Sequence, residues 1–553
     1  MKKTRVTLFA LLLLGVVGCN EGFEAEAGLR NPATENQNSV DVAPAEVVYY
    51  NKECASQILG YKENYYKLEH MRTAYSNLMG TTRAESDEII EPTHCHYKFI
   101  PKDGSELTLL EDCPDLELFA YPLDAIVSEG EYFESENPLL RYAVVPIDME
   151  LPDVERELLY EMFIPDDRRT RMPTRCAHID ADLAERLVDE AMRITGNEEE
   201  PINKTRASTW YGRGRLTAYD ELLRDYIPLR GVKVRITRAG VTHTAITDSL
   251  GNFRMTEGFK YGAEYSIIWE RADWDIREGI VGQANYKAGS NVTDQPLNLN
   301  INGGKSIRYC HIHRACYRHF YHTKLGYPKA RPSGRAVKIS YMDELNADNL
   351  GYFDPGEIGL INTDIKIYKG STYISQFHQI FETTLHELGH ASHCFNMRLF
   401  QFEEVHTMIK DSWACAIAYY SLKEEVEYLA SNSAAFLGLP TEAVTETYKD
   451  FIQQYNEQEW PFVGRNLRYS PMFIDLIDNF NQRDYYYIEK PNDYMSYPND
   501  YITGYTFAVL GNILKDAYAP HSLKTGLRAN KPAGVTDADI DVLFELYEEN
   551  WVD

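Results

Sequence analysis

Residues 383–395 read Thr-Thr-Leu-His-Glu-Leu-Gly-His-Ala-Ser-His-Cys-Phe, which places His386 and His390 four positions apart. On a helix, residues at i and i+4 stand one turn apart on the same face. Two imidazoles in this arrangement can bind one Zn²⁺ ion, each about 2 Å from it. Glu387 follows His386 directly and can act as the general base for a water molecule. The spacing therefore predicts a helix that carries a catalytic metal site.

The surrounding residues favour a helix that is buried on one side. No proline occurs between Ser371 and Phe395, and apolar side chains recur at steps of three and four positions: Phe377, Ile380, Phe381, Leu385, Leu388 and Ala391. The alternative is a chance HExxH on an ordinary core helix, but two buried histidines would then need polar partners. The motif resembles the active-site helix of the zincin metallopeptidases, in which HExxH binds zinc and activates water.

The third zinc ligand is expected on the following helix, because His393 lies about 10 Å along the axis from His386. The gluzincin branch of the zincins usually supplies a glutamate there. Glu403 and Glu404 follow His390 after only 13 and 14 residues, which leaves too little chain for a turn back. Asp411, 21 residues after His390, allows two turns out, a loop and two turns back. We therefore predict Asp411 as the ligand; the alternative is an aspartate paired with a nearby Lys or Arg.

The N-terminus has the pattern of an export signal. Basic residues precede an apolar run from Val6 to Val17 that is too short to span a bilayer. Val16-Val17-Gly18-Cys19 resembles a bacterial lipobox, which implies a signal peptide at residues 1–19 and a lipid anchor on Cys19. The alternative is a plain secretory signal with an incidental cysteine.

The residues after Cys19 bear on the location of the chain. Asn20 is not the Asp that favours inner-membrane retention, so the resemblance implies an outer-membrane lipoprotein. Residues 20–45 lack periodicity and are predicted to be a flexible tether. Its acidic residues resemble the tethers of surface-exposed lipoproteins in the Bacteroides group, which implies a position at the cell surface.

Composition bounds the class of protein. The 553 residues are too many for one core, and 44% are apolar and 25% charged, as in folded proteins. A net charge of −28 argues against nucleic acid as a partner, because phosphate binding needs clustered Lys and Arg. Eight cysteines follow Cys19, and an exported chain can form disulfides. A Cys394–Cys415 bridge is not expected, since antiparallel helices would hold them about 10 Å apart.

Three folded segments follow the tether, and they predict a multidomain α+β chain. Residues 46–209 mix helical and strand patterns, including a predicted helix over 154–163, and form an N-terminal α/β domain of unknown role. Residues 210–302 alternate like short strands. Thr247-Asp-Ser-Leu-Gly-Asn-Phe253 resembles a turn of the carboxypeptidase-regulatory-like, transthyretin-type β-sandwich.

Residues 303–553 are predicted to be the zincin-like catalytic domain, a mixed sheet with a helical subdomain. Its strand pattern covers 357–368, and the resemblance assigns substrate binding by strand addition to Gly359–Thr363. Tyrosines within 468–475 and 501–505 are candidates for stabilising an oxyanion, and the sequence does not choose between them.

The sequence thus predicts a zinc-dependent metallopeptidase that cleaves a peptide or protein substrate outside the cell. In this hypothesis His386, His390 and Asp411 bind Zn²⁺, and Glu387 moves the proton from water to the leaving amine. The alternative is a non-catalytic surface lipoprotein that keeps a zincin fold and binds a peptide or glycan. Glu387 favours the enzyme, because a purely structural zinc site needs no base between its ligands.

Overall fold

The structure is a computed structural model, and it describes residues 47–548 apart from 51, 166–175, 177, 199–208, 289–291, 332–334, 345–349, 356–362, 370–376, 398–401, 458–469, 490–498 and 500. The predicted signal peptide (1–19), the lipidation site Cys19 and the tether (20–45) lie outside the described residues. None of the described helices combines the length and the apolar character that crossing a membrane requires.

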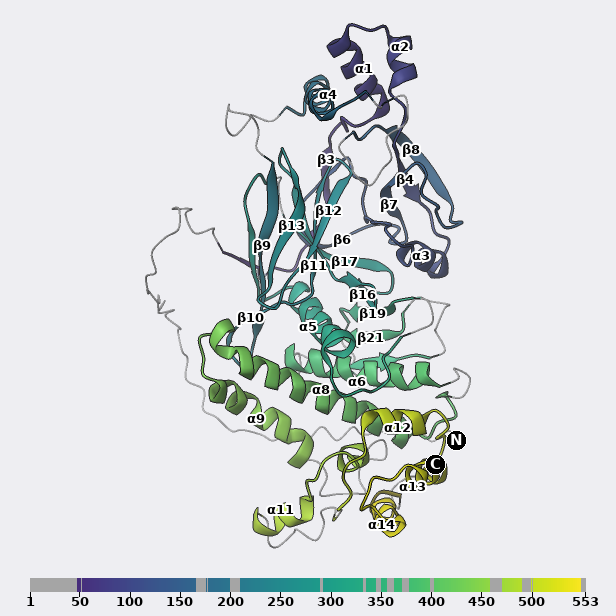
Figure 1. Ribbon diagram of the computed structural model, residues 1–553, viewed down its shortest axis with the longest axis vertical. Coiled ribbons are helices and arrows are strands. Elements are labelled where there is room, and N and C mark those ends of the chain that lie inside the picture. The colour runs from purple at the N-terminus through teal and green to yellow at the C-terminus, as the bar shows by residue number, and fades with distance from the viewer. Residues whose placement is uncertain are drawn as a thin grey trace, which may run out of the picture. The chain divides into compact units, whose positions relative to one another are not determined.

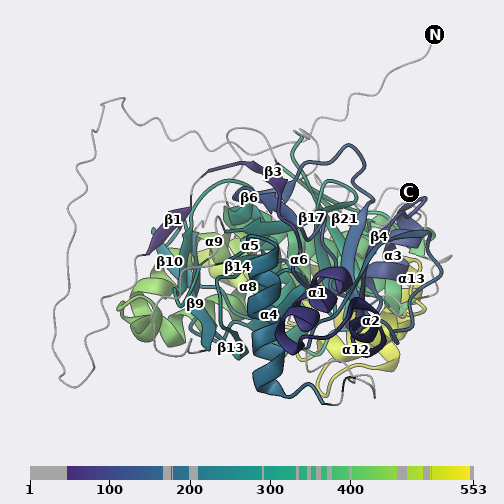
Figure 2. The same ribbon diagram turned by 90° about the horizontal axis from the view of Figure 1, so that it is seen from above.

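The described chain is built from both helices and sheets, so the prediction of a mixed α and β chain is confirmed at that level. The segment at 47–198 contains a three-stranded antiparallel sheet in which β4 lies between its two partners. Its described helices include α1 and α4, which lie side by side (Figure 2). The elements of this segment are β1 (Val48–Tyr50), β2 (Ala55–Ser56), β3 (Ile58–Tyr61), α1 (Leu68–Met79), α2 (Arg83–Ile89), β4 (His94–Phe99), α3 (Gly104–Glu111), β5 (Ala125–Val127), β6 (Gly130–Phe133), β7 (Arg141–Pro146), β8 (Arg156–Met162) and α4 (Ala181–Ile194).

The helix predicted over 154–163 is wrong, because residues 156–162 form strand β8. β8 pairs with β4 in antiparallel register from Phe99 opposite Arg156 to His94 opposite Met162. The ladder hydrogen bonds offered by β4 outweigh the helix propensity of the Glu- and Leu-rich stretch.

The segment at 209–302 supplies two sheets that contribute to one apolar core. The turn at Thr247–Phe253 joins β12 to β13, as the sequence predicts: Asp248 accepts hydrogen bonds from the Leu250 and Asn252 N–H groups, and Gly251 takes a φ of 78°. The strands of this segment are β9 (Trp210–Asp220), β10 (Asp225–Pro228), β11 (Lys233–Arg238), β12 (Val241–Ile246), β13 (Asn252–Phe259), β14 (Glu264–Ile268), β15 (Glu270–Arg271), β16 (Trp274–Glu278), β17 (Gly282–Lys287) and β18 (Leu297–Ile301).

The largest sheet continues past residue 302 into the segment with the HExxH motif. Its strand order is β12-β11-β14-β17-β16-β19-β21-β20, where the last three are β19 (Val337–Met342), β21 (Ile365–Tyr368) and β20 (Gly351–Phe353). β16 and β19 pair in parallel, so the boundary predicted at 302/303 falls within one sheet. Among the described strands, β20 is the end of this order.

The remaining elements are helices, and the end of the large sheet packs against α6. α6 contacts α5, β20, β21 and α8, and α6 and α8 lie side by side (Figure 1). The helices are α5 (Ser306–Tyr317), the π-helix η2 (Arg318–His322), α6 (Phe377–Asn396), α8 (Thr407–Phe436), α9 (Thr441–Glu457), α10 (Met472–Asp475), α11 (Gln482–Glu489), α12 (Phe507–Leu514), α13 (Pro520–Ala529) and α14 (Asp537–Glu548).

A buried ion cluster holds α8 in place. Glu425 of α8 accepts hydrogen bonds from Arg230, 2.8 Å away, and from Arg318, 2.9 Å away. Burial alone would raise the pKa of Glu425, but Arg230, Arg318 and Arg314 outweigh it and hold that pKa well below its usual range. Arg230 follows β10, and Arg318 begins the π-helix η2 directly after α5. The cluster therefore fixes α8 against both the strands of the 209–302 segment and the helical segment at 306–322.

Candidate metal centre

Helices α6 and α8 run antiparallel and approach each other closely. His390 faces Asp411, Gly389 faces Ala414, and His386 faces Cys415, so positions that rise along one helix fall along the other. A Cβ atom on Gly389 would lie 2.7 Å from the Cα atom of Ala414. The absence of a side chain at Gly389 is therefore what lets α8 come close to the HExxH face of α6.

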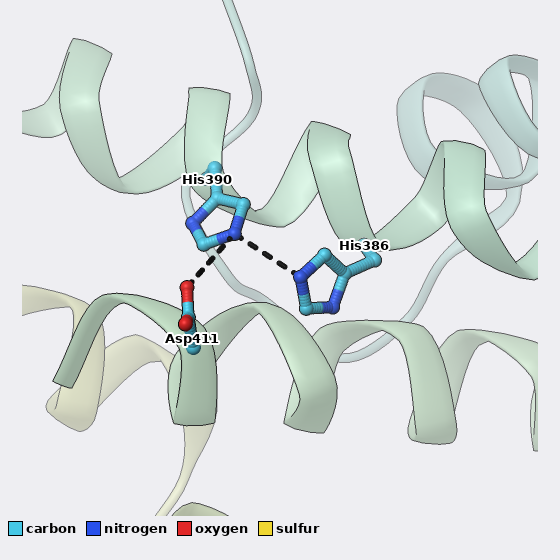
Figure 3. A group of neighbouring side chains, drawn as sticks. All are labelled: His386, His390 and Asp411. Atoms are coloured by element: carbon cyan, nitrogen blue, oxygen red, sulfur yellow. Dashed lines mark hydrogen bonds and ion pairs between the residues drawn. The ribbon is translucent and has the colours of Figure 1, made fainter. Parts of the chain in front are cut away.

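This approach brings together the three side chains selected from the sequence (Figure 3). Nε2 of His386 lies 3.1 Å from Nε2 of His390, which lies 3.3 Å from Oδ1 of Asp411. Ligand atoms about 2 Å from a tetrahedral zinc ion are about 3.3 Å apart. Two imidazole nitrogens and one carboxylate oxygen also form the donor set of a catalytic zinc site with an open fourth position. The residues present therefore fit Zn²⁺.

The protonation of the histidines suits metal binding. Burial lowers the pKa of His386 to about 4. The pKa of His390 lies well below its usual range, because of burial first and then of the neighbouring His386, His393 and Lys410. Both imidazoles are therefore neutral at pH 7, and a metal ligand must be neutral to offer its lone pair.

Glu387 lies beside the ligands and is almost fully buried. Burial raises its pKa to about 8 with help from the Asp411 carboxylate, while the Phe353 backbone N–H lowers it by donating a hydrogen bond. A cation between the three ligands would lower this pKa, because opposite charge favours the ionised carboxylate. Glu387 is thus placed to alternate between a base and an acid.

Strand β20 passes directly over Glu387. A Cβ atom on Gly351 would lie 2.7 Å from Oε1 of Glu387 and 2.5 Å from Cγ2 of Thr383. β20 pairs with β21 on one side only, within the described chain. The stretch to which the sequence analysis assigned strand addition, Gly359–Thr363, lies outside the described residues except for Thr363. The described strand beside the motif is therefore β20, about eight residues earlier.

Cys415 supports His386 from the side opposite to the metal. Its Sγ lies 3.7 Å from Nδ1 of His386. Burial raises the pKa of the Cys415 thiol well above its usual range, so the thiol is neutral. If Nε2 of His386 binds a metal ion, Nδ1 carries the proton and donates a hydrogen bond to this sulfur, which would fix the orientation of the ring.

Other candidates from the sequence lie away from this centre. Glu403 and Glu404 are exposed in the connection between α6 and α8. Tyr501 is 70% exposed, and the hydroxyl of Tyr505 donates to the Leu527 carbonyl. Tyr469 lies outside the described residues. Cys394 and Cys415 are not bridged, and neither are the other cysteines of the described chain.

The sequence predicted no role at the centre for three nearby residues, namely Gly389, Cys415 and Glu382. Gly389 lies inside the motif, and its only signal was the lack of a side chain on a face that must meet another helix. Cys415 lies four positions after Asp411 on α8, on the face directed at α6. Glu382 lies four positions before His386 on the same face of α6.

Comparisons with known proteins do not place the chain in a family. No family model matches it, and no curated protein matches it. A crystal structure of a 9R-lipoxygenase from Cyanothece PCC8801 matches 22% of this chain and 21% of its own, with 18% sequence identity and a TM-score of 0.12. A likeness of that extent carries no argument about fold or activity.

Proposed function

We propose that the chain is a zincin-like metallopeptidase that uses Zn²⁺ to hydrolyse peptide bonds outside the cell, anchored to the outer membrane by a lipid on Cys19. The observation that carries the proposal is the convergence of His386, His390 and Asp411 with Glu387 beside them. A structural zinc site is closed by a fourth protein ligand, whereas three ligands leave a position open for water or substrate.

The chain's own residues divide the chemistry among them. Zinc, when bound, polarises the scissile carbonyl and makes water acidic enough to lose a proton at neutral pH. Glu387 takes this proton and delivers it to the leaving amine. The Phe353 N–H donates a hydrogen bond to the Glu387 carboxylate and so holds this base in position. Strand β20, which ends the order of the described strands in the large sheet, binds the extended substrate through backbone hydrogen bonds.

The test is cleavage of a mixed peptide library by the purified chain, with Glu387→Gln and chelator-treated protein alongside. We expect the wild type to cleave, added Zn²⁺ to restore the chelated protein, and Glu387→Gln to bind zinc but cleave about 10²–10⁴-fold more slowly. Peptide cleavage by Glu387→Gln at the wild-type rate would contradict this mechanism. Peptide binding by the zinc-loaded wild type without any cleavage would instead support a non-catalytic binding protein.

A further inference from the structure

Glu382 belongs to the face of α6 that carries the metal ligands. It precedes His386 by four residues, so the two side chains lie about 6 Å apart along the helix axis on one face. The Glu382 carboxylate also acts electrostatically on the Cys415 thiol, whose sulfur contacts Nδ1 of His386. Helical spacing and this electrostatic influence agree that Glu382 lies near the centre, one turn away from it.

Within the described residues, no cation pairs with the Glu382 carboxylate. The part of the chain that the structure describes provides Glu382 with neither an ion pair nor a hydrogen bond, and no neighbouring charge affects its pKa. Burial alone raises the pKa of Glu382 to about 7, because the ionised carboxylate loses contact with water.

The other buried carboxylates of the protein are treated differently. Asp364 pairs with Arg335 at 2.5 Å, and Glu425 pairs with Arg230 at 2.8 Å. Glu131 and Asp475 are also fully buried and accept hydrogen bonds instead, Glu131 from the Lys305 N–H and Asp475 from Nε2 of Gln482. These buried carboxylates thus have either a guanidinium or a hydrogen-bond donor from the chain. Glu382 is only partly covered, so a positive charge from outside the chain can reach it.

The geometry points to Glu382 as a specificity-determining residue that binds a positively charged group of the substrate peptide close to the scissile bond. This inference rests on the proposed peptidase function and deepens it. An offset of about 6 Å corresponds to about two residues of an extended chain, so the charged group lies within two residues of the bond that is cleaved. Ammonium and guanidinium groups share the required chemistry, and they come from a free N-terminus or from a Lys or Arg side chain.

The experiment measures binding, so it does not depend on turnover. Zinc-loaded Glu387→Gln protein is immobilised and given four pools of random hexapeptide amides built from uncharged residues. The four pools combine two choices. The N-terminus is either free or acetylated, and the peptides contain either Lys and Arg or, in place of these two residues, norleucine. The retained peptides are quantified by mass spectrometry.

We expect at least one of the cationic pools to be retained about 10- to 100-fold more than the fully neutral pool. Preference for the acetylated pool with Lys and Arg identifies a side chain as the bound group, and preference for the free-amine pool with norleucine identifies the N-terminus. Adding Glu382→Gln should abolish the preference, Glu382→Asp should keep part of it, and Glu404→Gln, an exposed control, should keep all of it.

Equal retention of the four pools, or an unchanged preference after Glu382→Gln, overturns the inference. Loss of zinc from Glu382→Gln also overturns it, because Glu382 would then serve the metal. Charge preference through Glu382 together with a wild type that cleaves nothing would leave this inference standing and contradict the proposed hydrolysis.

Discussion

Asp411 takes part in the centre although its side chain is one methylene shorter than the glutamate usual in gluzincins. The contact of Gly389 with Ala414 compensates, because it lets the backbone of α8 approach α6. Asp411→Ala removes one of the three proposed zinc ligands, and we expect zinc affinity to fall at least about 100-fold, with loss of activity. Glu404→Ala should keep both, since Glu404 is exposed. Metal analysis of the two purified variants checks this. If Asp411→Ala keeps its zinc and Glu404→Ala loses it, Asp411 is not a ligand.

Single residues differed in how well the sequence could predict their place. The spacing of His386, Glu387 and His390 follows from helix geometry alone, and the count of residues needed for a turn back pointed to Asp411. Glu382 could not be found in this way. A lone glutamate in a helical pattern suggests a solvent-facing position. The electrostatic influence of Glu382 on Cys415 of another helix supports its place near the proposed metal ligands.

Between elements, the spacing of α6 and α8 depends on Gly389. Gly389→Ala forces the two helices apart or strains them, so we expect a lower free energy of unfolding by about 1–3 kcal/mol and weaker zinc binding. Gly511→Ala is a matched control. A Cβ there would lie 2.7 Å from Cδ of Pro328, away from the ligands, so stability should fall while zinc affinity is retained. Denaturant unfolding and zinc titration measure the two effects, and equal zinc affinity in both variants would contradict the role of Gly389.

Elements were predictable where local pattern and long-range pairing agree. The helix over the HExxH motif has an apolar stripe that buries against α5 and the sheet, so pattern and packing coincide. Strand β8 was missed because its sequence favours a helix, and its strand form depends on β4, almost sixty residues earlier. The parallel pairing of β16 with β19 likewise joins segments that the sequence analysis treated as separate.

Across the whole molecule, a second buried network connects the N-terminal segment to the large sheet. Glu111 of α3 pairs with Lys338 at 3.2 Å, Arg141 at 3.5 Å and also Arg277. Burial alone would raise the pKa of Glu111, but these cations lower it from 4.5 to about 2. A carboxyl whose folded pKa is depressed contributes stability above its unfolded pKa and loses it as the pH falls.

We therefore expect stability from Glu111 to be complete above about pH 4.5 and to disappear toward pH 2. Glu111→Gln leaves three cations without their shared anion and should cost about 3–5 kcal/mol at neutral pH. Glu106→Gln on the same helix removes a surface pair with Lys102 and should barely move the unfolding midpoint. Unfolding curves of both proteins from pH 7 to pH 2 test this. If the free energy of unfolding depends on pH equally in the wild type and in Glu111→Gln, the prediction is contradicted.

The predicted lipid anchor is also testable on the whole chain. Cys19→Ser should move the protein from the membrane fraction to the soluble fraction, because the substitution removes the thiol that would carry the proposed lipid anchor. Fractionation followed by a carbonate wash measures the change. A Cys19→Ser protein that stays with the membrane after the wash would show that Cys19 is not the anchor.

The pairing of Glu425 with Arg230 and Arg318 also has a consequence for the order of assembly. Glu425 lies about four turns beyond Asp411 on the same continuous helix, and it is held by contacts that involve protein atoms alone. The position of the third ligand is thus set by folding rather than by the ion. We expect the chain to fold first and to bind zinc afterwards. One molecule could then acquire, lose and replace the ion during its lifetime.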